Sequence, residues 1–264
     1  MGSPIAVTSA QLAGWMAAFL WPFLRMLALV SMAPVFGERA VPRRHKVATA
    51  ALLTLAVAPV LGPMPQVPPV SGDGAWLAAQ QVLVGLAMGF SMRLVFAMVQ
   101  AAGEYAGLQM GLSFASFFDP GSGGQTMVLG RLLNALAMLA FLAFDGHLMV
   151  VAVLVHSFEA LPVSTEPLAA RGWMVLAAAG TQVIAGGLML ALPMVAALLI
   201  LNLTMGVLTR VSPQISIFSV GFPMTLLAGL VLLQLVVQQL PAFLEPRFAA
   251  AFDATLRVLQ ALRP

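Results

Sequence analysis

Long apolar stretches separated by short polar segments dominate this chain. A membrane-spanning helix needs about 20 apolar residues at 1.5 Å rise per residue, so stretches of this kind predict several such helices. Segment 47–61 is short for a span, and segment 172–209 contains Pro193, which predicts either one long bent helix or a tight helical pair. The apolar segments cover about 10–33, 47–61, 75–100, 131–157, 172–209 and 211–244.

Composition turns this pattern into a fold class. Hydrophobic residues make up 61% of the 264 residues and charged residues 8%, whereas about a quarter of a soluble domain is charged. We therefore expect an all-α polytopic membrane protein of long kinked helical hairpins. The formal net charge of +3 comes with no basic face, so nucleic-acid binding has no support. The chain has no cysteine, which excludes disulfides and thiolate metal sites.

Basic residues predict the orientation, with one conflict. The dense cluster of Arg39, Arg43, Arg44 and Lys46 favours a cytoplasmic position for its loop, which puts segments 62–74 and 159–171 on the outside. Six crossings would return the C-terminus to the outside. The C-terminal arginines favour the opposite side, so either one segment does not cross fully or the helices are not ordinary spans. These arginines are Arg247, Arg257 and Arg263.

The last helical segment is amphipathic. Phe248, Phe252, Leu256 and Leu259 are spaced four, four and three residues apart, which places them on one helical face. This spacing fits an interfacial or subunit-facing helix and a packed terminal helix equally well.

Glycines recur at four-residue spacing in two places. Gly85 and Gly89 form one GxxxG motif, and Gly103, Gly107 and Gly111 form a double one. Helices in lipid associate through close backbone approach over small residues, because the hydrophobic effect between them is weak. The glycines therefore predict tight helix packing, either within the chain or with another subunit.

Several polar residues interrupt the apolar runs. Each charged one would cost about 2.5–3.5 kcal/mol at a helix centre facing lipid, so these side chains must face protein or water. Asn134, Asp145 and His156 are eleven residues apart, and they line one polar stripe if Gly146 does not break the helix. Arg93 and Glu104 share this spacing. The ionisable set is Arg25, Arg93, Glu104, Arg131, Asp145, His147 and His156.

These polar residues leave three interpretations open. Asp145 and His156 are suitable for a proton relay in an ion-coupled multi-pass permease, and all of the residues are suitable for hydrogen bonding between helices or subunits. A metal site has little support, because His147 and His156 are nine residues apart with no carboxylate at ligand spacing. Ser113 with His147 resembles a serine protease only faintly, because Phe114 stands where a small residue is needed. We expect no enzyme activity and no cofactor.

The stretch GLQMGLSFASFFDPGSGGQ at 107–125 interrupts the helical pattern. Its DPGSGGQ run cannot be regular helix, and bulky apolar residues precede it. Irregular backbone survives at membrane depth only when it is buried in protein or lines a water-filled space. The stretch therefore predicts a deformable plug for a pore, or else an ordinary turn flanked by core aromatics. The bulky residues are Met110, Leu112, Phe114, Phe117 and Phe118.

Three further stretches carry a resemblance to a known family. Three stretches follow one another along the chain: first APVFGERAVPRRHKVATAALLTLAVAP, then the region from GLQMGLSF through DGH to HSFEALPV, and last TRVSPQISIFSVGFP. Together they resemble the FliR family of flagellar type III secretion export-gate proteins over nearly the whole chain. Injectisome counterparts are similar, but Gly221-Phe222-Pro223 and GLQMGLSF lie closer to the flagellar pattern.

The resemblance implies a fold and a function. FliR-like proteins join FliP and FliQ in a helical spiral around the export channel, with residues 1–170 here FliP-like and 171–264 FliQ-like. Helical hairpins raised from the bilayer plane would remove the orientation conflict. FlhB-like and FlhA-like components, unfolded exported proteins and membrane lipid are the implied partners, in the bacterial inner membrane at the flagellar basal body. The implied plug covers 110–124, with Met110, Gly111, Leu112, Ser113, Phe114, Phe117 and Phe118.

Overall fold

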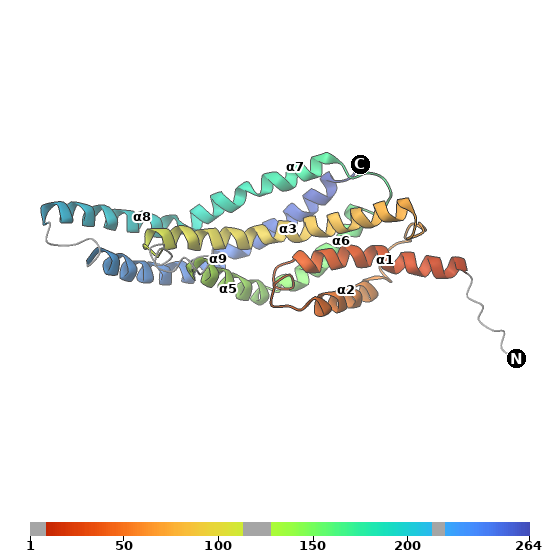
Figure 1. Ribbon diagram of the computed structural model, residues 1–264, viewed down its shortest axis with the longest axis horizontal. Coiled ribbons are helices and arrows are strands. Elements are labelled where there is room, and N and C mark those ends of the chain that lie inside the picture. Colours follow the sequence, from red (N-terminus) through yellow and green to blue (C-terminus); the bar gives the residue numbers. More distant parts are fainter. Residues whose placement is uncertain (1–8, 113–127, 213–219) are drawn as a thin grey trace. The chain divides into compact units, whose positions relative to one another are not determined.

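The computed structural model describes residues 9–112, 128–212 and 220–264, and these residues form helices without strands (Figure 1). The predicted all-α class is confirmed. The helices are α1 (Ser9–Met32), α2 (Arg43–Val57), α3 (Gly72–Gln109), α5 (Val128–Ala143), α6 (Gly146–Ala160), α7 (Ala170–Ala179), α8 (Thr181–Val211) and α9 (Phe222–Ala261).

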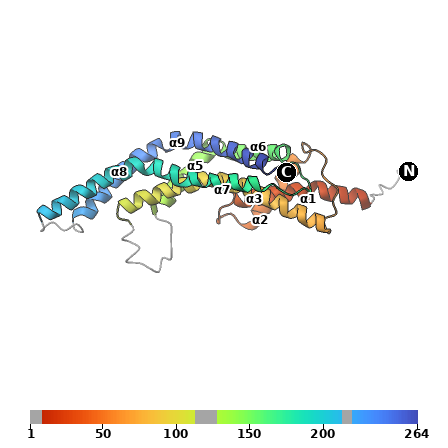
Figure 2. The ribbon, with the colours of Figure 1, turned by 90° about the horizontal axis from the view of Figure 1, so that it is seen from above.

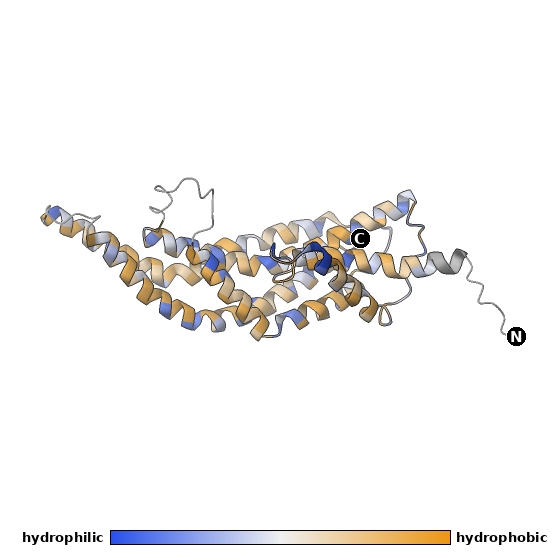
Figure 3. Cartoon of the chain, turned by 60° about the horizontal axis from the view of Figure 1, so that its bottom comes forward, coloured by the Kyte–Doolittle hydropathy of each residue, from blue (hydrophilic) through white to orange (hydrophobic). Residues whose placement is uncertain are grey.

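Four helical stretches in the described part of the chain are long and apolar enough to cross a membrane, and α5 with α6 would make a fifth, broken span. Figure 3 shows hydrophobic residues predominating along the helices. Helix α2 has only 15 residues and is not among the candidate spans. The four stretches are Gly14–Met32, Gly72–Gln109, Ala170–Val211 and Phe222–Ala261.

Four helices, α3, α7, α8 and α9, differ in extent from the sequence pattern. Helix α3 continues past residue 100 to Gln109, so the glycine ladder belongs to it. Helices α7 and α8 follow one another with only Gly180 between them, and Pro193 lies inside α8. The amphipathic C-terminal segment is continuous with the preceding apolar segment in α9, which has 40 residues and contains Pro241 and Pro246. Prolines are tolerated inside membrane helices because neighbouring groups satisfy the freed backbone.

The chain divides into two compact units that are interleaved in sequence. Unit 1 consists of Met1–Arg93, His147–Ala178 and Ala251–Pro264, and unit 2 of Leu94–Gly146 and Ala179–Ala250. Helix α3 contributes to both units, and so does α9. The division into a FliP-like 1–170 and a FliQ-like 171–264 concerns resemblance to other subunits and stays a prediction.

In unit 1, α1 and α2 lie side by side (Figures 1 and 2). Helix α2 buries Ala50, Thr54 and Val57, and the Thr54 hydroxyl donates to Met26 Sδ of α1 at 3.2 Å. A cluster of apolar side chains surrounds the fully buried Trp21 of α1. It includes Ala17, Leu77, Met64, Val67 and Val163.

Hydrogen bonds to backbone groups of segment 161–169 hold this segment in unit 1. Trp76 Nε1 donates to Thr165 O at 3.2 Å, and Gln80 Nε2 donates to Glu166 O at 2.7 Å. The Ala169 amide donates to Leu262 O at 3.0 Å. Residue 262 thus lies at the same end of unit 1 as segment 161–169.

Unit 2 is built around three phenylalanine rings. Phe96, Phe141 and Phe248 contact one another with ring centroids 5.2–5.6 Å apart, and all three are buried. Phe248, from the apolar face of the amphipathic C-terminal segment, is therefore buried within the chain. Phe252 and Leu259 of the same face are buried in unit 1. Helices α8 and α9 run side by side, with Arg247 Nη2 donating to Met189 Sδ at 3.9 Å (Figures 1 and 2).

Candidate functional site: glycine contacts, buried polar groups and the start of the plug

The first GxxxG motif packs α3 directly on the backbone of α1. A Cβ at position 85 would clash with Arg25 O, and one at position 89 would lie 2.7 Å from Met32 Cβ. Real Cβ contacts of this length do not occur, and at position 85 the obstacle is backbone that cannot turn aside. Gly85 and Gly89 therefore set the distance between α3 and α1 within unit 1.

Gly103 has the same role between α3 and α5 in unit 2. A Cβ on Gly103 would lie 2.6 Å from Gly130 Cα, and one on Gly130 would lie 3.1 Å from Gln100 O. On α8, Gly186 leaves room for the Met98 side chain, and a Cβ on Gly187 would lie 2.9 Å from Met98 O. The sequence pattern did not single out Gly130, Gly186 or Gly187, because none is part of a GxxxG ladder.

Helix α3 ends in a Schellman motif at the start of the predicted plug. Gly111 has a φ of 76°, the Leu112 amide donates to Gly107 O at 3.0 Å, and the Gly111 amide donates to Leu108 O at 3.1 Å. These are the two hydrogen bonds of the motif, in which only glycine takes the left-handed position without strain. Met110 is 1% exposed and packs against α9 at Gly229, where a Cβ would lie 2.5 Å from Met110 Cγ.

Gly111 thus ends the helix, and a helix-packing role for it stays a prediction, as does one for the buried Gly107. The plug residues Ser113, Phe114, Phe117 and Phe118 lie outside the described residues.

Arg25 is fully buried in unit 1, where its guanidinium joins α1 to α3 and to the end of α6. Nε donates to Gln81 Oε1 at 2.8 Å, Nη1 to Ser157 O at 2.9 Å and to its Oγ at 3.2 Å, and Nη2 to Leu161 O at 3.0 Å. The Phe158 ring centroid lies 4.2 Å from Cζ. Carbonyls at the C-terminal end of a helix carry partial negative charge, so they stabilise this cation.

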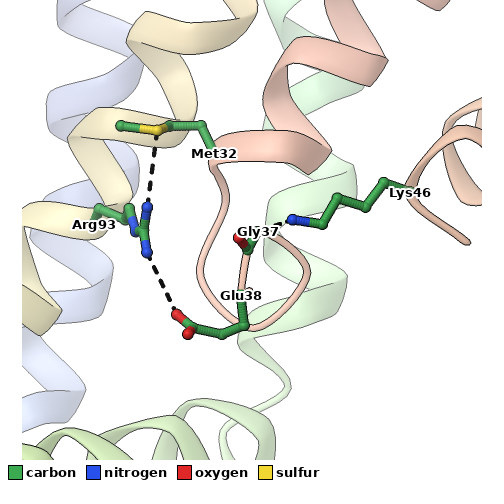
Figure 4. Close-up of polar contacts among 5 residues, drawn as sticks. All are labelled: Met32, Gly37, Glu38, Lys46 and Arg93. Carbon is green, nitrogen blue, oxygen red and sulfur yellow. Dashed lines mark hydrogen bonds and ion pairs between the residues drawn. The ribbon is translucent and has the colours of Figure 1, made fainter. Parts of the chain in front are cut away.

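Arg93 of α3 reaches the turn between α1 and α2 with its side chain (Figure 4). Its Nη2 forms an ion pair with Glu38 Oε1 at 3.4 Å, and Nη1 donates to Met32 Sδ at 3.9 Å. Lys46 Nζ donates to Gly37 O at 2.9 Å in the same turn. Both side chains of the ion pair are more than a third exposed, so solvent screens it.

The other predicted polar residues have varied environments. Glu104 is half-buried and accepts from Gln100 Nε2 at 3.0 Å, and Asn134 is half-buried in α5. Arg131 and Asp145 are exposed. His156 is exposed and lies 3.2 Å from Glu159 Oε2 through Nδ1. His147 Nδ1 is buried without a hydrogen-bond partner in the described part of the chain. A role for any of them between subunits stays a prediction.

The expected polar stripe of Asn134, Asp145 and His156 required an unbroken helix, and the helix is broken. Helix α5 ends at Ala143 and α6 begins at Gly146, with Asp145 at a φ of 54° between them. A Cβ on Gly146 would clash with the Phe141 ring, so the break also makes room for that ring. Among the described residues, no group of three or more His, Cys, Asp or Glu side chains could hold a metal ion.

The fold and these contacts define an integral membrane protein whose helices pack through glycines. The family of bacterial export proteins, family 1, matches residues 16–251. Flagellar biosynthetic protein FliR of Pectobacterium carotovorum subsp. carotovorum is 47% identical over 258 residues, covering 98% of both chains. FliR of Escherichia coli strain K12 is 45% identical with the same coverage, and FliR of Bacillus subtilis strain 168 is 27% identical over 93% of this chain and 95% of its own.

The chain therefore belongs to the FliR family of bacterial export proteins. This confirms the resemblance carried by the sequence motifs. Membership makes the protein a component of flagellar protein export rather than an enzyme.

Proposed function

We propose that this protein is a pore-forming subunit of the flagellar type III export gate, in the bacterial inner membrane at the basal body. It completes a helical channel with FliP-like and FliQ-like subunits and closes that channel with the plug segment 110–124. Stacked Phe and Met side chains block ions by excluding water from a narrow pore. Arrival of an unfolded exported chain displaces them.

The observation that carries this proposal is the way α3 ends. The Schellman motif at Gly111 stops the helix directly before the phenylalanine-rich stretch, and Met110 is anchored against Gly229 of α9. Phe114, Phe117 and Phe118 follow this fixed point by only a few residues. A short tether between a rigid helix and bulky apolar side chains suits a plug that must move aside and return.

Large apolar side chains on α8 and α9 support assembly with partner subunits. Ile200 is 70% exposed, Leu203 73% and Val231 64%. FliQ-like and FliP-like helices or lipid would cover these faces, with FlhB-like and FlhA-like components at the cytoplasmic entrance. In this proposal, residues 1–170 take a FliP-like place in the spiral and 171–264 a FliQ-like one.

Deleting 112–118 tests the plug. The deletion should leave the complex assembled, because α3, α5 and α9 contact one another outside it, while cells become permeable to ions and small solutes. Conductance of purified complexes in planar bilayers measures the leak. The control is the triple variant Phe114→Leu, Phe117→Leu and Phe118→Leu, which keeps apolar bulk and should stay closed. Normal conductance in the deletion, with assembly intact, would rule out the plug.

Co-purification separates the gate from an ion-coupled permease based on Asp145 and His156. A gate subunit purifies with two other small membrane proteins, and Asp145→Asn with His156→Gln leaves export unchanged. A permease purifies alone and transports a solute, and that double substitution abolishes its transport. Recovery of a self-sufficient transporter would overturn the proposal.

A further inference from the structure

The side chains of three arginines at the turn between α1 and α2 bond to none of the residues that the structure describes. Arg39, Arg43 and Arg44 are all exposed, and none forms a hydrogen bond or ion pair with a described residue. The charged neighbours in this turn are already engaged: Glu38 pairs with Arg93, and Lys46 donates to Gly37 O (Figure 4). The surplus positive charge of the turn therefore belongs to the three arginines.

The start of α2 adds to this charge instead of neutralising it. Its N-cap is Pro42, which makes no side-chain capping hydrogen bond, and its first turn contains no acidic residue. The N-terminal end of a helix carries partial positive charge and free amide groups. Arg43 and Arg44 occupy the first positions of α2, so helix and side chains together favour an anion here.

An apolar stripe follows the arginines along the outer face of α2. Val47, Leu52 and Leu55 are 45%, 67% and 61% exposed, and at 100° per residue they lie on the same side of the helix as Arg44. The buried residues Ala50, Thr54 and Val57 lie about 80–140° around the helix from Arg44, on the neighbouring face. Helix α2 is thus basic at its start and apolar along one exposed face, and it is too short to count as a candidate span.

We propose that this face of α2 binds an anionic phospholipid. Arg39, Arg43 and Arg44 hold the phosphate of the headgroup, and the acyl chains lie along Val47, Leu52 and Leu55. Guanidinium groups suit phosphate because their N–H donors form paired, charge-assisted hydrogen bonds. The adjoining stripe favours a lipid over an acidic protein segment, because a phospholipid joins its phosphate covalently to long apolar chains. Basic residues beside an apolar helical face are typical of helices at membrane surfaces.

The test uses the full chain, purified from membranes in detergent with the subunits that accompany it. Micelles contain either phosphatidylglycerol or phosphatidylcholine, and mass spectrometry of the washed complex gives the retained lipid across a titration. The variant Arg39→Gln, Arg43→Gln and Arg44→Gln is compared with Arg171→Gln, Arg257→Gln and Arg263→Gln. The control removes the same charge from exposed arginines elsewhere in unit 1. Elution volume and tryptophan emission verify that both variants are folded.

The expected result is a loss of phosphatidylglycerol affinity of roughly a hundredfold in the first variant, because each basic residue near an anionic surface contributes about fivefold. Phosphatidylcholine retention and the control variant stay unchanged. A second variant, Leu52→Ser with Leu55→Ser, keeps every charge and should still weaken phosphatidylglycerol binding. Inorganic phosphate should compete poorly, because it lacks the chains that the stripe holds.

Three results would overturn the proposal. Equal phosphatidylglycerol retention in the arginine variant and the control would show that the turn holds no lipid. Efficient competition by inorganic phosphate, together with no effect of the serine variant, would indicate a simple phosphate site. Loss of an accompanying protein from the arginine variant, with its lipid retained, would assign the face to an acidic partner.

Discussion

The two units of this protein both contain glycine contacts between helices, and they differ in the contacts that accompany them. Unit 1 adds polar side chains that reach buried backbone: Arg25 bonds to α3 and to the end of α6, and Trp76 and Gln80 hold segment 161–169. In unit 2, Gly103 lies against Gly130 and Gly187 against the Met98 backbone. The core of unit 2 also contains three phenylalanine rings that contact one another.

The difference follows from what each kind of contact can supply in an apolar environment. Association between helices in lipid gains little from the hydrophobic effect, so it needs either hydrogen bonds or close backbone approach. Hydrogen bonds from a guanidinium can join several elements at one point, whereas a glycine contact joins only two helices along a line. Unit 1 carries three connecting segments to fix, and unit 2 consists mainly of long helices lying beside each other.

The largest predicted effect comes from removing the Arg25 guanidinium. Arg25→Met removes the guanidinium and leaves Gln81 Oε1 and Leu161 O without their donor, whereas Ser157 O still accepts from the Leu161 amide. A buried acceptor left unpaired costs about 1–3 kcal/mol, so the two together should lower the stability of unit 1 by about 2–6 kcal/mol. All four tryptophans lie in unit 1 segments, so tryptophan-detected unfolding in detergent measures this loss.

Arg25→Lys separates the role of charge from the role of geometry. The guanidinium donates from three separate nitrogens to Gln81, Ser157 and Leu161, whereas a lysine ammonium has all its donors on one nitrogen and should keep only part of these bonds. We expect it to restore less than half of the loss. Full recovery in Arg25→Lys would mean that positive charge alone matters and that the joining of three helices by one planar group does not.

The sequence predicted the glycine contacts better than the polar ones, for a physical reason. A GxxxG spacing is local, and Gly85, Gly89 and Gly103 each face a neighbouring helix. The high cost of a charge in lipid predicted that Arg25 must face protein or water, and it is fully buried in protein. Its partners were not predictable, because Gln81, Ser157 and Leu161 lie 56, 132 and 136 residues away.

The sequence pattern raised a break at Gly146 as a possibility but did not decide it. Spacing arguments assume a continuous helix, and Asp145 at positive φ ends that continuity. Aspartate reaches this conformation more easily than most residues, and Gly146 follows it directly. The reverse error occurred in α9, where the pattern treated an apolar segment and an amphipathic segment separately although they form one helix that contains Pro241 and Pro246.

A single methyl group should disturb unit 2. Gly103→Ala places a Cβ 2.6 Å from Gly130 Cα, and neither backbone can move without separating α3 from α5. Overpacking of this kind costs about 1–3 kcal/mol, which exceeds the roughly 1 kcal/mol that alanine gains over glycine in a helix. Hydrogen exchange of peptides from α3 and α5 should therefore become faster, while peptides from unit 1 keep their rates.

The matched control for this substitution is Gly206→Ala. Gly206 is also a helical glycine of unit 2, on α8, and a Cβ there would meet nothing within 4 Å. Only the higher helix propensity of alanine then acts, so the free energy of unfolding of unit 2 should rise by up to about 1 kcal/mol. Opposite signs for the two alanines are the expected outcome. Equal effects would show that helix propensity, and not the close contact of α3 with α5, decides the stability of unit 2.

The smallest effect should come from a polar contact of unit 1 that is exposed to solvent, the Glu38–Arg93 ion pair. Glu38→Gln removes the charge from the Arg93 ion pair and keeps its shape, and both side chains are more than a third exposed. Exposed pairs of this kind contribute less than about 1 kcal/mol, and salt screens them. The tryptophan-detected transition should therefore shift only slightly at low salt and not at all in about 1 M salt. The double variant Glu38→Gln with Arg93→Gln should lose no more stability than Arg93→Gln alone, since that single substitution already removes the ion pair. A loss comparable to that of Arg25→Met would mean that charge, rather than burial of the bonded groups, determines which polar contacts hold unit 1 together.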